Sequence, residues 1–478
     1  MTAETHSGAF ARMGHAVLET GREYRDGIRH LRGCPREIWI AYLVKILESI
    51  CYFSSVLVLM PFLIGDMGLP DVDAGVVFGV FSASMSLCSL FVGFIADSLG
   101  IKKALLFGLV LGLIGRAGIS FSTDPWIVYP ALFFLSVAFA YMIPLIAASV
   151  KLFSTKKAQK FAYSWYYVVM NVGSLIAGLT LDSLRSFFTE PLRFAFLGAD
   201  LSVRPLQVIF LVGVLATVGS LVLVTFFVRP VIPPEERGEE PAAVPAAAAV
   251  AAPAAKKSAW EIMVEVGREK TFWVFIAFIF MLVLVKMIFQ YNHSLYPVYM
   301  DRIGLKEWTG KLYSINPALI ILLVPVVTAA TSKMKSYNVI LLGTFVSASS
   351  VMFMGLGESI GLIVAFQVCL SLGEALWSPR LYDYTASIAP PGKEASYMAL
   401  SKVPMFFAKV FAGPASGYLL ATLCAPTGPR NTELMWFLVA MSTLVSPITL
   451  LLARRWLDVE SRKQKEKAAA PSAGIAPA

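Results

Sequence analysis

The stretch Gly93-Phe-Ile-Ala-Asp97-Ser-Leu-Gly100-Ile-Lys102-Lys103 joins two long apolar runs, residues 74–95 and 104–122. Gly93 allows close packing of neighbouring helices, Asp97 can cap or pair at a helix end, and Gly100 permits a tight turn. The same order, an apolar run followed by a short polar turn, recurs along the whole chain. The stretch therefore indicates one turn within an array of membrane-spanning helices.

The composition excludes a water-soluble globule. Of the 478 residues, 57% are hydrophobic and only 15% are charged. Soluble domains carry about 25% charged residues, and single hydrophobic cores stop growing beyond roughly 250–300 residues. We therefore predict an integral membrane protein whose main solvent is lipid.

A helix that crosses a bilayer needs about 20 mainly apolar residues. Strands are excluded for these runs because the runs are too long and lack alternation of period two. We predict an all-α membrane protein with twelve transmembrane helices: 38–63, 74–95, 104–122, 126–153, 160–184, 206–228, 271–300, 310–331, 338–356, 361–389, 396–423 and 433–457.

The distribution of basic residues predicts the orientation of these helices. Lys102, Lys103, Lys151 and Lys335 lie in or beside loops that follow even-numbered runs, and both chain ends are rich in arginine and lysine. The positive-inside rule then predicts that both termini are cytoplasmic. The net charge of +9 is thereby explained as an orientation signal, and we expect no nucleic-acid partner.

The longest connection is rich in alanine and proline, which is typical of a linker. It divides the chain into two sets of six helices, the layout of many secondary transporters. We predict a cytoplasmic N-terminal segment, an N-terminal bundle, a cytoplasmic linker, a C-terminal bundle and a cytoplasmic tail: 1–37, 38–228, 229–270, 271–457 and 458–478.

Five charged residues fall near the middle of predicted helices: Lys45, Glu48, Lys286, Glu374 and Lys409. Each costs about 2.5–3.5 kcal/mol on insertion scales, and such residues usually mark a transport pathway. Pairing between helices would explain one or two of them. Five indicate a water-accessible central cavity.

The mixture of both charge signs suits a zwitterionic solute, with its amine near Glu374 or Glu48 and its carboxylate near a lysine. Tyr52 shares a helix face with Lys45 and Glu48 because the three are spaced i, i+3 and i+7. Carboxylates at low dielectric can also take up protons, so Glu48 and Glu374 are candidates for proton coupling. For His293 we favour an interfacial structural role over a proton relay.

The quoted stretch 93–103 resembles the loop signature G-x-x-x-D-x-x-G-x-[RK]-[RK] of the major facilitator superfamily. In that family the segment latches the two halves during alternating access. The resemblance therefore implies gating roles for five residues: Gly93, Asp97, Gly100, Lys102 and Lys103.

Two further stretches resemble the proton-coupled oligopeptide transporters within that superfamily. Tyr166-Tyr167-Val-Val-Met-Asn171-Val-Gly173-Ser174-Leu175 is similar to their FYxxINxGSL signature, and Gly373-Glu374-Ala-Leu-Trp-Ser378-Pro379 to their GE-x-x-x-SP segment. The resemblance implies that Asn171 contacts a peptide backbone and that Glu374 receives the peptide's amino terminus. Asn171 as a hydrogen bond between helices is the alternative.

The polar segment around Gln290 and Asn292 is weakly similar to the same family, and Trp377 is a candidate for shaping a side-chain pocket. The family's ExxER motif appears here as Lys45-Ile-Leu-Glu48-Ser49, so its first glutamate and its arginine are missing. Lys45, one turn from the arginine's place, is a candidate replacement.

These observations predict a secondary transporter in the cell membrane that uses the proton gradient to take up di- or tripeptides or peptide-like zwitterions. The alternative is a transporter or exporter of another amphiphilic or anionic small molecule, with altered or absent proton coupling. The chain has no HExxH, GxSxG or Walker motif. We therefore expect no enzymatic activity, catalytic residue, metal or cofactor, and we expect a monomer.

Overall fold

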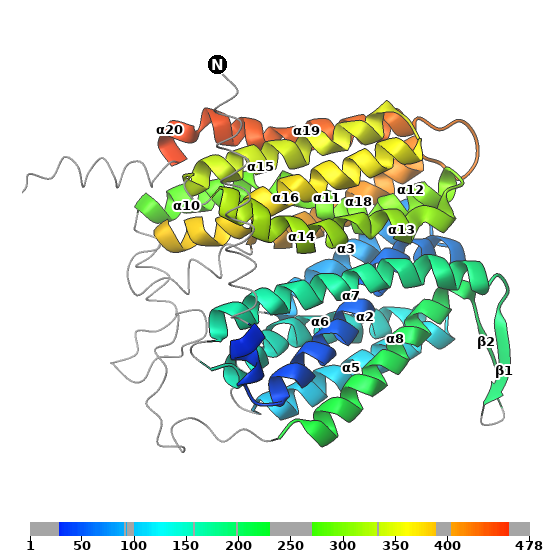
Figure 1. Cartoon of the computed structure of the whole chain (residues 1–478). Coiled ribbons are helices and arrows are strands. Elements are labelled where there is room, and N and C mark those ends of the chain that lie inside the picture. Colours follow the sequence, from blue (N-terminus) through cyan, green and yellow to red (C-terminus); the bar gives the residue numbers. More distant parts are fainter. Residues whose placement is uncertain are drawn as a thin grey trace, which may run out of the picture.

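The structure is a computed structural model (Figure 1) that describes residues 28–89, 92, 100–155, 158–196, 199–229, 270–331, 334–388 and 403–457. Within these ranges, twelve helical segments are long and apolar enough to cross a membrane. This confirms the predicted fold class. The tail and most of the predicted N-terminal segment and linker lie outside the described residues.

The first six spans form the N-terminal half. They are α2 (Glu37–Pro61) with η1 (Phe62–Asp66), α3 (Asp71–Cys88), α5 (Ile101–Phe121), α6 (Pro125–Phe153), α7 (Gln159–Phe187), and α8 (Pro205–Val222) with η2 (Leu223–Phe227). Helix α2 packs against α7, α8 and α6, and α5 packs between α6 and α8.

The last six spans form the C-terminal half. They are α10 (Lys270–Met281) with α11 (Val283–Ser294) and α12 (Tyr296–Arg302); η4 (Lys306–Trp308), α13 (Thr309–Tyr313) and α14 (Ile315–Ala330); α15 (Ser336–Ser350) with η5 (Val351–Leu356); α16 (Ile360–Ile388); α18 (Val403–Leu423); and α19 (Thr432–Leu452) with α20 (Arg454–Leu457).

The structure differs from the sequence prediction at several points. The predicted helix 310–331 is interrupted at Ser314, and the predicted helix 433–457 at Ala453. The predicted helix 271–300 is interrupted at Leu282 and Leu295, and Pro297 in the first turn of α12 fits this restart because proline is tolerated where a helix begins. The sequence also gave no expectation of an antiparallel hairpin between α7 and α8, formed by β1 (Leu192–Phe196) and β2 (Ala199–Val203). We call the end of the bundle that carries this hairpin the hairpin side.

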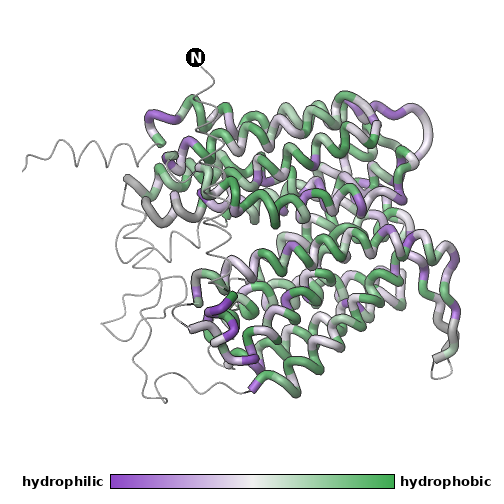
Figure 2. The backbone as a smooth tube through the Cα atoms, in the orientation of Figure 1, coloured by the Kyte–Doolittle hydropathy of each residue, from purple (hydrophilic) through white to green (hydrophobic). Residues whose placement is uncertain are grey.

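The opposite end is called the linker side, because α8 with η2 ends there and α10 begins there (Figure 1). Hydrophobic residues run along the helices, and hydrophilic residues are found mainly near the helix ends and in the turns (Figure 2). Large apolar side chains such as Leu215 and Leu322, each 67% exposed, point out of the bundle. An apolar outer surface is what a lipid environment favours.

Two pairs of helices from different halves make the close contacts between them. Helix α3 packs along α18, and α7 packs along α13 and α14. Glycine permits the first crossing, since a Cβ added at Gly75 would lie 2.5 Å from the carbonyl oxygen of Gly413 and 2.9 Å from the Cα of Gly417. The backbones therefore touch directly where the two halves meet.

Ion pairs reinforce this contact on the hairpin side. Arg302 of α12 donates to both carboxylate oxygens of Asp71 on α3, at 2.6 and 3.0 Å, and Arg185 of α7 pairs with Asp301 at 2.8 Å. The carboxylate of Asp182 accepts the backbone N–H groups of Gly310 and Lys311. Among the described residues, further hydrogen bonds between the halves join Ser174 to Tyr313, Ser314 to the carbonyl oxygen of Leu175, and Lys409 to Met85.

The glycine crossing predicts a conformational effect of a small substitution. Gly75→Ala should push α3 away from α18 and weaken closure of the hairpin side. The distance between spin labels at the exposed positions Asp73 and Thr427, measured by pulsed electron resonance in a cysteine-free background, should increase or broaden. Gly219→Ala is the control, because its added Cβ meets nothing closer than 3.9 Å. An unchanged distance in Gly75→Ala would contradict this role of the crossing.

Candidate functional site

The carboxylate of Glu48 is buried and paired inside the N-terminal half. Arg116 of α5 approaches it at 3.4 Å, and the exposures of the two residues are 2% and 1%. Arg116 also donates to the hydroxyl of Thr217 at 2.7 Å and lies over the ring of Phe139 at 5.1 Å. The negative charge of Glu48 is therefore balanced without a proton or a solute.

Lys45 and Tyr52 lie along the same side of α2 as Glu48, as their spacing predicted. The ammonium of Lys45 lies 4.9 Å above the ring of Tyr166 on α7, a contact between a cation and an aromatic face. Tyr52 packs edge to face on Phe139 with ring centroids 5.0 Å apart. Lys45 is 4% exposed, and its charge lies within electrostatic reach of Glu48.

Glu374 of α16 has a different environment. Its carboxylate accepts a hydrogen bond of 3.1 Å from the side-chain amide of Asn316 on α14, and the same amide also donates to Ser371. No arginine, lysine or histidine of the described part of the chain forms an ion pair with Glu374. The residue is only partly buried.

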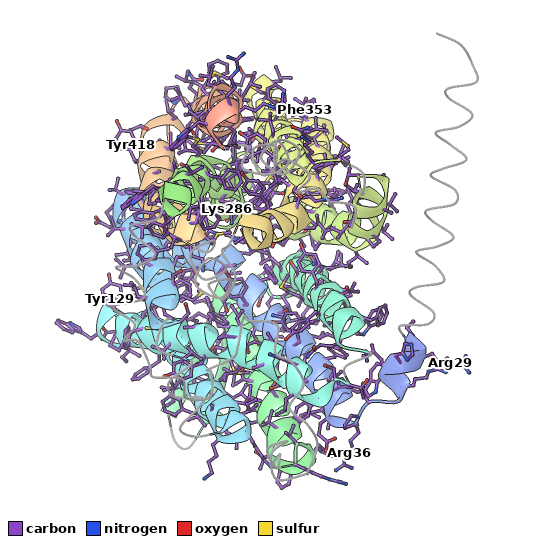
Figure 3. All side chains as sticks on the ribbon, turned by 90° about the vertical axis from the view of Figure 1, so that its left-hand side faces the viewer. Arg29, Arg36, Tyr129, Lys286, Phe353 and Tyr418 are labelled. Atoms are coloured by element: carbon purple, nitrogen blue, oxygen red, sulfur yellow. The ribbon has the colours of Figure 1, made fainter. Side chains whose placement is uncertain are left out.

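Two lysines of the C-terminal half also lack a carboxylate partner among the described residues. Lys286 of α11 is 7% exposed and lies 5.6 Å above the ring of Trp377, one turn along α16 from Glu374. The ammonium of Lys409 on α18 donates to the sulfur of Met85 at 3.4 Å. Viewed from the linker side, Lys286 lies toward the middle of the molecule, whereas Tyr129 and Tyr418 lie at its edge (Figure 3).

A chain of neighbouring groups connects these residues across the interface. His293 of α11 shares a hydrogen bond of 3.2 Å with the hydroxyl of Tyr313, which in turn shares one of 3.2 Å with Ser174 of α7. Tyr313 lies within electrostatic reach of Glu374, and His293 within reach of Lys409. We call Glu374, Lys286 and Lys409 the central charge cluster.

The remaining predicted solute contacts are occupied by bonds within their own half. The amide of Asn171 donates to the carbonyl oxygen of Tyr167 on its own helix, at 2.9 Å. Gln290 donates to the sulfur of Met405 at 3.4 Å, which orients it toward α18. Asn292 accepts a hydrogen bond of 3.2 Å from Gln367 and so faces α16. Gln290 lies one turn from Lys286 on α11.

The predicted gating residues are only partly described. Gly93 and Asp97 lie outside the described residues. Gly100 has a φ of +74°, which fits the predicted tight turn. Lys102 donates to the carbonyl oxygens of Thr225 and Val228 at 2.9 and 2.6 Å. A cation at these last carbonyls stabilises the end of the sixth span, whereas Lys103 is exposed.

Three residues that matter for this site were missed from the sequence. Arg116, Asn316 and Tyr313 were not among the predicted site residues. Arg116 stands in a glycine-rich apolar run and Asn316 directly precedes Pro317. A polar residue in such a run was the available signal, but its partner depends on how helices distant in sequence pack together.

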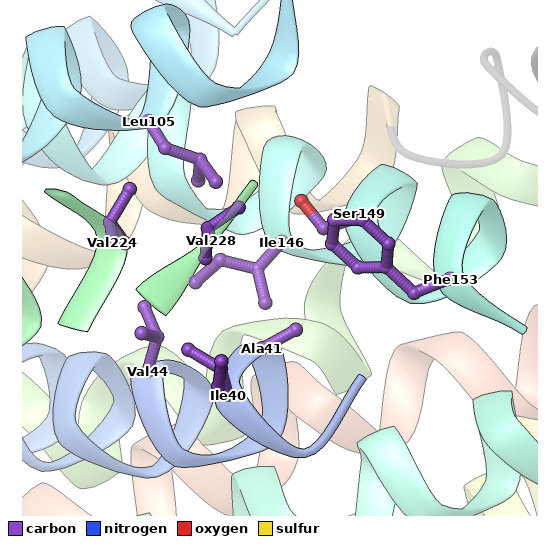
Figure 4. A pocket seen from close by; sticks show the side chains of 9 residues that line it. All are labelled: Ile40, Ala41, Val44, Leu105, Ile146, Ser149, Phe153, Val224 and Val228. Carbon is purple, nitrogen blue, oxygen red and sulfur yellow. The ribbon is translucent and has the colours of Figure 1, made fainter. Parts of the chain in front are cut away.

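An apolar pocket lies elsewhere, within the N-terminal half near the linker side (Figure 4). It is lined by Ile40, Ala41, Val44, Leu105, Ile146, Ser149, Phe153, Val224 and Val228. These residues include a single polar side chain and none of the predicted site residues. The pocket is therefore a packing defect between α2, α5, α6 and η2 and offers nothing that would hold a charged solute.

Comparison with known proteins places residues 41–414 in a family match described as Major Facilitator Superfamily. The chain is similar in structure to a POT family transporter solved in complex with a thioalcohol-conjugated peptide, with a TM-score of 0.69 and 17% identity. That likeness covers 89% of this chain and 97% of the other, and at this identity it shows the fold alone.

Two curated relatives are similar in sequence to smaller shares of this chain. Dipeptide and tripeptide permease B of Shigella dysenteriae is 26% identical over 191 residues, which is 39% of this chain and 39% of the permease. Multidrug resistance protein MdtH of Photorhabdus laumondii is 22% identical over 363 residues, 75% of this chain and 79% of that protein.

The pairing of Glu48 with Arg116 predicts that removing Arg116 destabilises the protein strongly only while Glu48 remains charged. Arg116→Gln should lower the free energy of unfolding by about 3–5 kcal/mol, because it leaves a buried carboxylate without its partner. The double variant Arg116→Gln with Glu48→Gln should recover much of that loss. Thermal unfolding in detergent measures both, and Arg193→Gln on the exposed strand β1 is the control.

Additive losses in the double variant would contradict the assignment, because independent sites add whereas partners do not.

Proposed function

The chain belongs to the Major Facilitator Superfamily, and within its transporters we propose that it takes up di- or tripeptides or peptide-like zwitterions by alternating access, together with protons. The observation that carries this proposal is the carboxylate of Glu374, which accepts a hydrogen bond from the neutral amide of Asn316 and has no cationic partner among the described residues. An uncompensated charge at this depth is costly. A solute amine or a proton is the partner that it lacks.

The two unpaired lysines supply the other end of the recognition. A peptide whose amine pairs with Glu374 presents its carboxylate to Lys286, which lies over Trp377 on the same helix as Glu374. Once their present hydrogen bonds to Met405 and Ser371 are released, the side-chain amides of Gln290 and Asn316 can donate to the peptide bond. Charge complementarity of this kind selects zwitterions over neutral amphiphiles because each buried charge gains a partner.

Alternating access follows from the way the halves touch. The hairpin side is held by Arg302 with Asp71, by Arg185 with Asp301, and by the glycine crossing of α3 with α18. Loading from that side requires these contacts to separate while the linker-side ends approach each other. With the linker side in the cytoplasm, as the positive-inside rule predicts, release toward that side is uptake.

Of the two carboxylates predicted to couple protons, Glu374 is the better candidate. Glu48 has its charge balanced by Arg116 at 3.4 Å, so proton binding there would leave an arginine unpaired. Glu374 has no cationic partner among the described residues, so its carboxylate can bind a proton.

The comparisons support the peptide proposal in part. A POT family transporter of the same fold is described in complex with a conjugated peptide, and a partial relative is named a dipeptide and tripeptide permease. The longer match to a protein named for multidrug resistance and the altered helix-1 motif favour the second candidate function. That function is the export of another amphiphilic or anionic solute.

Uptake in proteoliposomes distinguishes peptide import from export of another solute. Labelled dipeptides should accumulate under an inward proton gradient well above protein-free vesicles. Absence of uptake across a broad dipeptide panel, together with proton-driven efflux of an amphiphilic dye, would contradict peptide import and favour the exporter.

Glu374→Gln should abolish proton-driven peptide uptake, because the amide neither attracts the amine nor carries a proton. The folded protein should be retained, since Asn316 can still hydrogen-bond to the new amide. Uptake rate and a size-exclusion profile measure the two properties. Glu307→Gln, at an exposed position of η4, is the matched control and should transport normally. Transport by Glu374→Gln at the normal rate would remove this residue from the mechanism.

A further inference from the structure

The central charge cluster contains more cations than carboxylates. In the C-terminal half, Lys286 and Lys409 each lack a carboxylate partner among the described residues, and Glu374 is the only unpaired carboxylate that accompanies them. In the N-terminal half, Glu48 is already used by Arg116, and Lys45 lies beside that pair. Both halves therefore leave a formal excess of positive charge near the interface.

A neutral zwitterion does not balance this cluster. Its one amine pairs with Glu374 and its one carboxylate pairs with one lysine, so the second lysine stays uncompensated. The contacts of these lysines are a ring of Trp377 at 5.6 Å and the sulfur of Met85 at 3.4 Å. Both are weak partners compared with a carboxylate, which forms charge-assisted hydrogen bonds.

We propose that the preferred solute carries a net negative charge, with at least two acidic groups, one for Lys286 and one for Lys409. The proposal rests on the proposed transport of peptide-like zwitterions and names their class: a dipeptide with an acidic side chain. Its amine meets Glu374, and its terminal and side-chain carboxylates meet the two lysines.

The neighbourhood of the three residues supports a single solute. Lys286 lies over Trp377, one turn of α16 from Glu374. Glu374 is within electrostatic reach of Tyr313, Tyr313 is bonded to His293, and His293 is within reach of Lys409. A dipeptide backbone spans about 7 Å when extended, and an acidic side chain adds a third branch. Glu374 and Lys409 are both partly exposed, and Lys286 is 7% exposed.

Binding to the purified full-length protein tests the proposal with matched dipeptides. Ala-Glu and Ala-Gln differ by one negative charge at nearly equal size, and Ala-Lys reverses that charge. By isothermal titration at neutral pH, Ala-Glu should bind about tenfold or more tightly than Ala-Gln, as expected for one added ion pair at reduced dielectric. Ala-Lys should bind more weakly than either.

Variants then assign the preference to the lysines. Lys286→Gln and Lys409→Gln should each reduce the ratio of Ala-Glu to Ala-Gln affinity toward one, while Lys286→Arg and Lys409→Arg should retain it. Lys306→Gln removes a positive charge at an exposed position of η4 and should leave the ratio unchanged. The ratio is measured within each variant, so a general loss of stability does not imitate the effect.

Four outcomes separate this inference from the proposed function. Preference for Ala-Glu that depends on both lysines supports it. Equal or weaker binding of Ala-Glu than of Ala-Gln overturns it and leaves peptide transport standing. Binding of glutarate, a dianion without an amine, but of no dipeptide overturns the peptide function and supports the anionic preference. Binding of none of these probes overturns both.

Discussion

The compensation of charge at membrane depth is the constraint on which this structure depends. Each ionisable side chain placed among twelve apolar helices needs a partner, because lipid and a packed interior solvate it poorly. In the N-terminal half, Arg116 meets this need for Glu48 inside one bundle. In the C-terminal half, Glu374 contacts an amide, Lys286 an aromatic ring and Lys409 a thioether instead. The first arrangement stabilises a bundle, and the second leaves charge for a solute to balance.

The interface between the halves is held by a close helix crossing and by a few ion pairs. Glycines let α3 and α18 touch backbone to backbone, so the crossing has little side-chain interdigitation to undo. The ion pairs of the hairpin side, such as Arg302 with Asp71, can be replaced by water when that side opens. A contact that is close yet easily rehydrated suits an interface that forms and separates in every transport cycle. The central charge cluster lies between the hairpin side and the linker side.

The sequence predicted much of the fold because hydropathy and length alone specify membrane helices. The twelve spans were predicted on that basis, and the shared face of Lys45 and Glu48 was predicted from their helical spacing. The breaks at Leu282 and Leu295, the hairpin β1–β2 and the partner of Glu48 were not. Arg116 lies 68 residues from Glu48 along the chain, and only the packing of α2 against its neighbours brings them together. The resemblance of 45–49 to the ExxER motif suggested Lys45 as a replacement for the missing arginine. In the structure, Arg116 of α5 is the cation that pairs with the carboxylate of Glu48.

Glu374, Lys286 and Lys409 are the residues proposed to hold the transported solute. A structure of the protein determined with a transported dipeptide bound tests this most directly. In that structure the peptide's amine should lie within hydrogen-bond distance of Glu374, and its acidic groups should contact Lys286 and Lys409. A peptide bound elsewhere, with Glu374 still bonded only to Asn316 and both lysines unchanged, would contradict it.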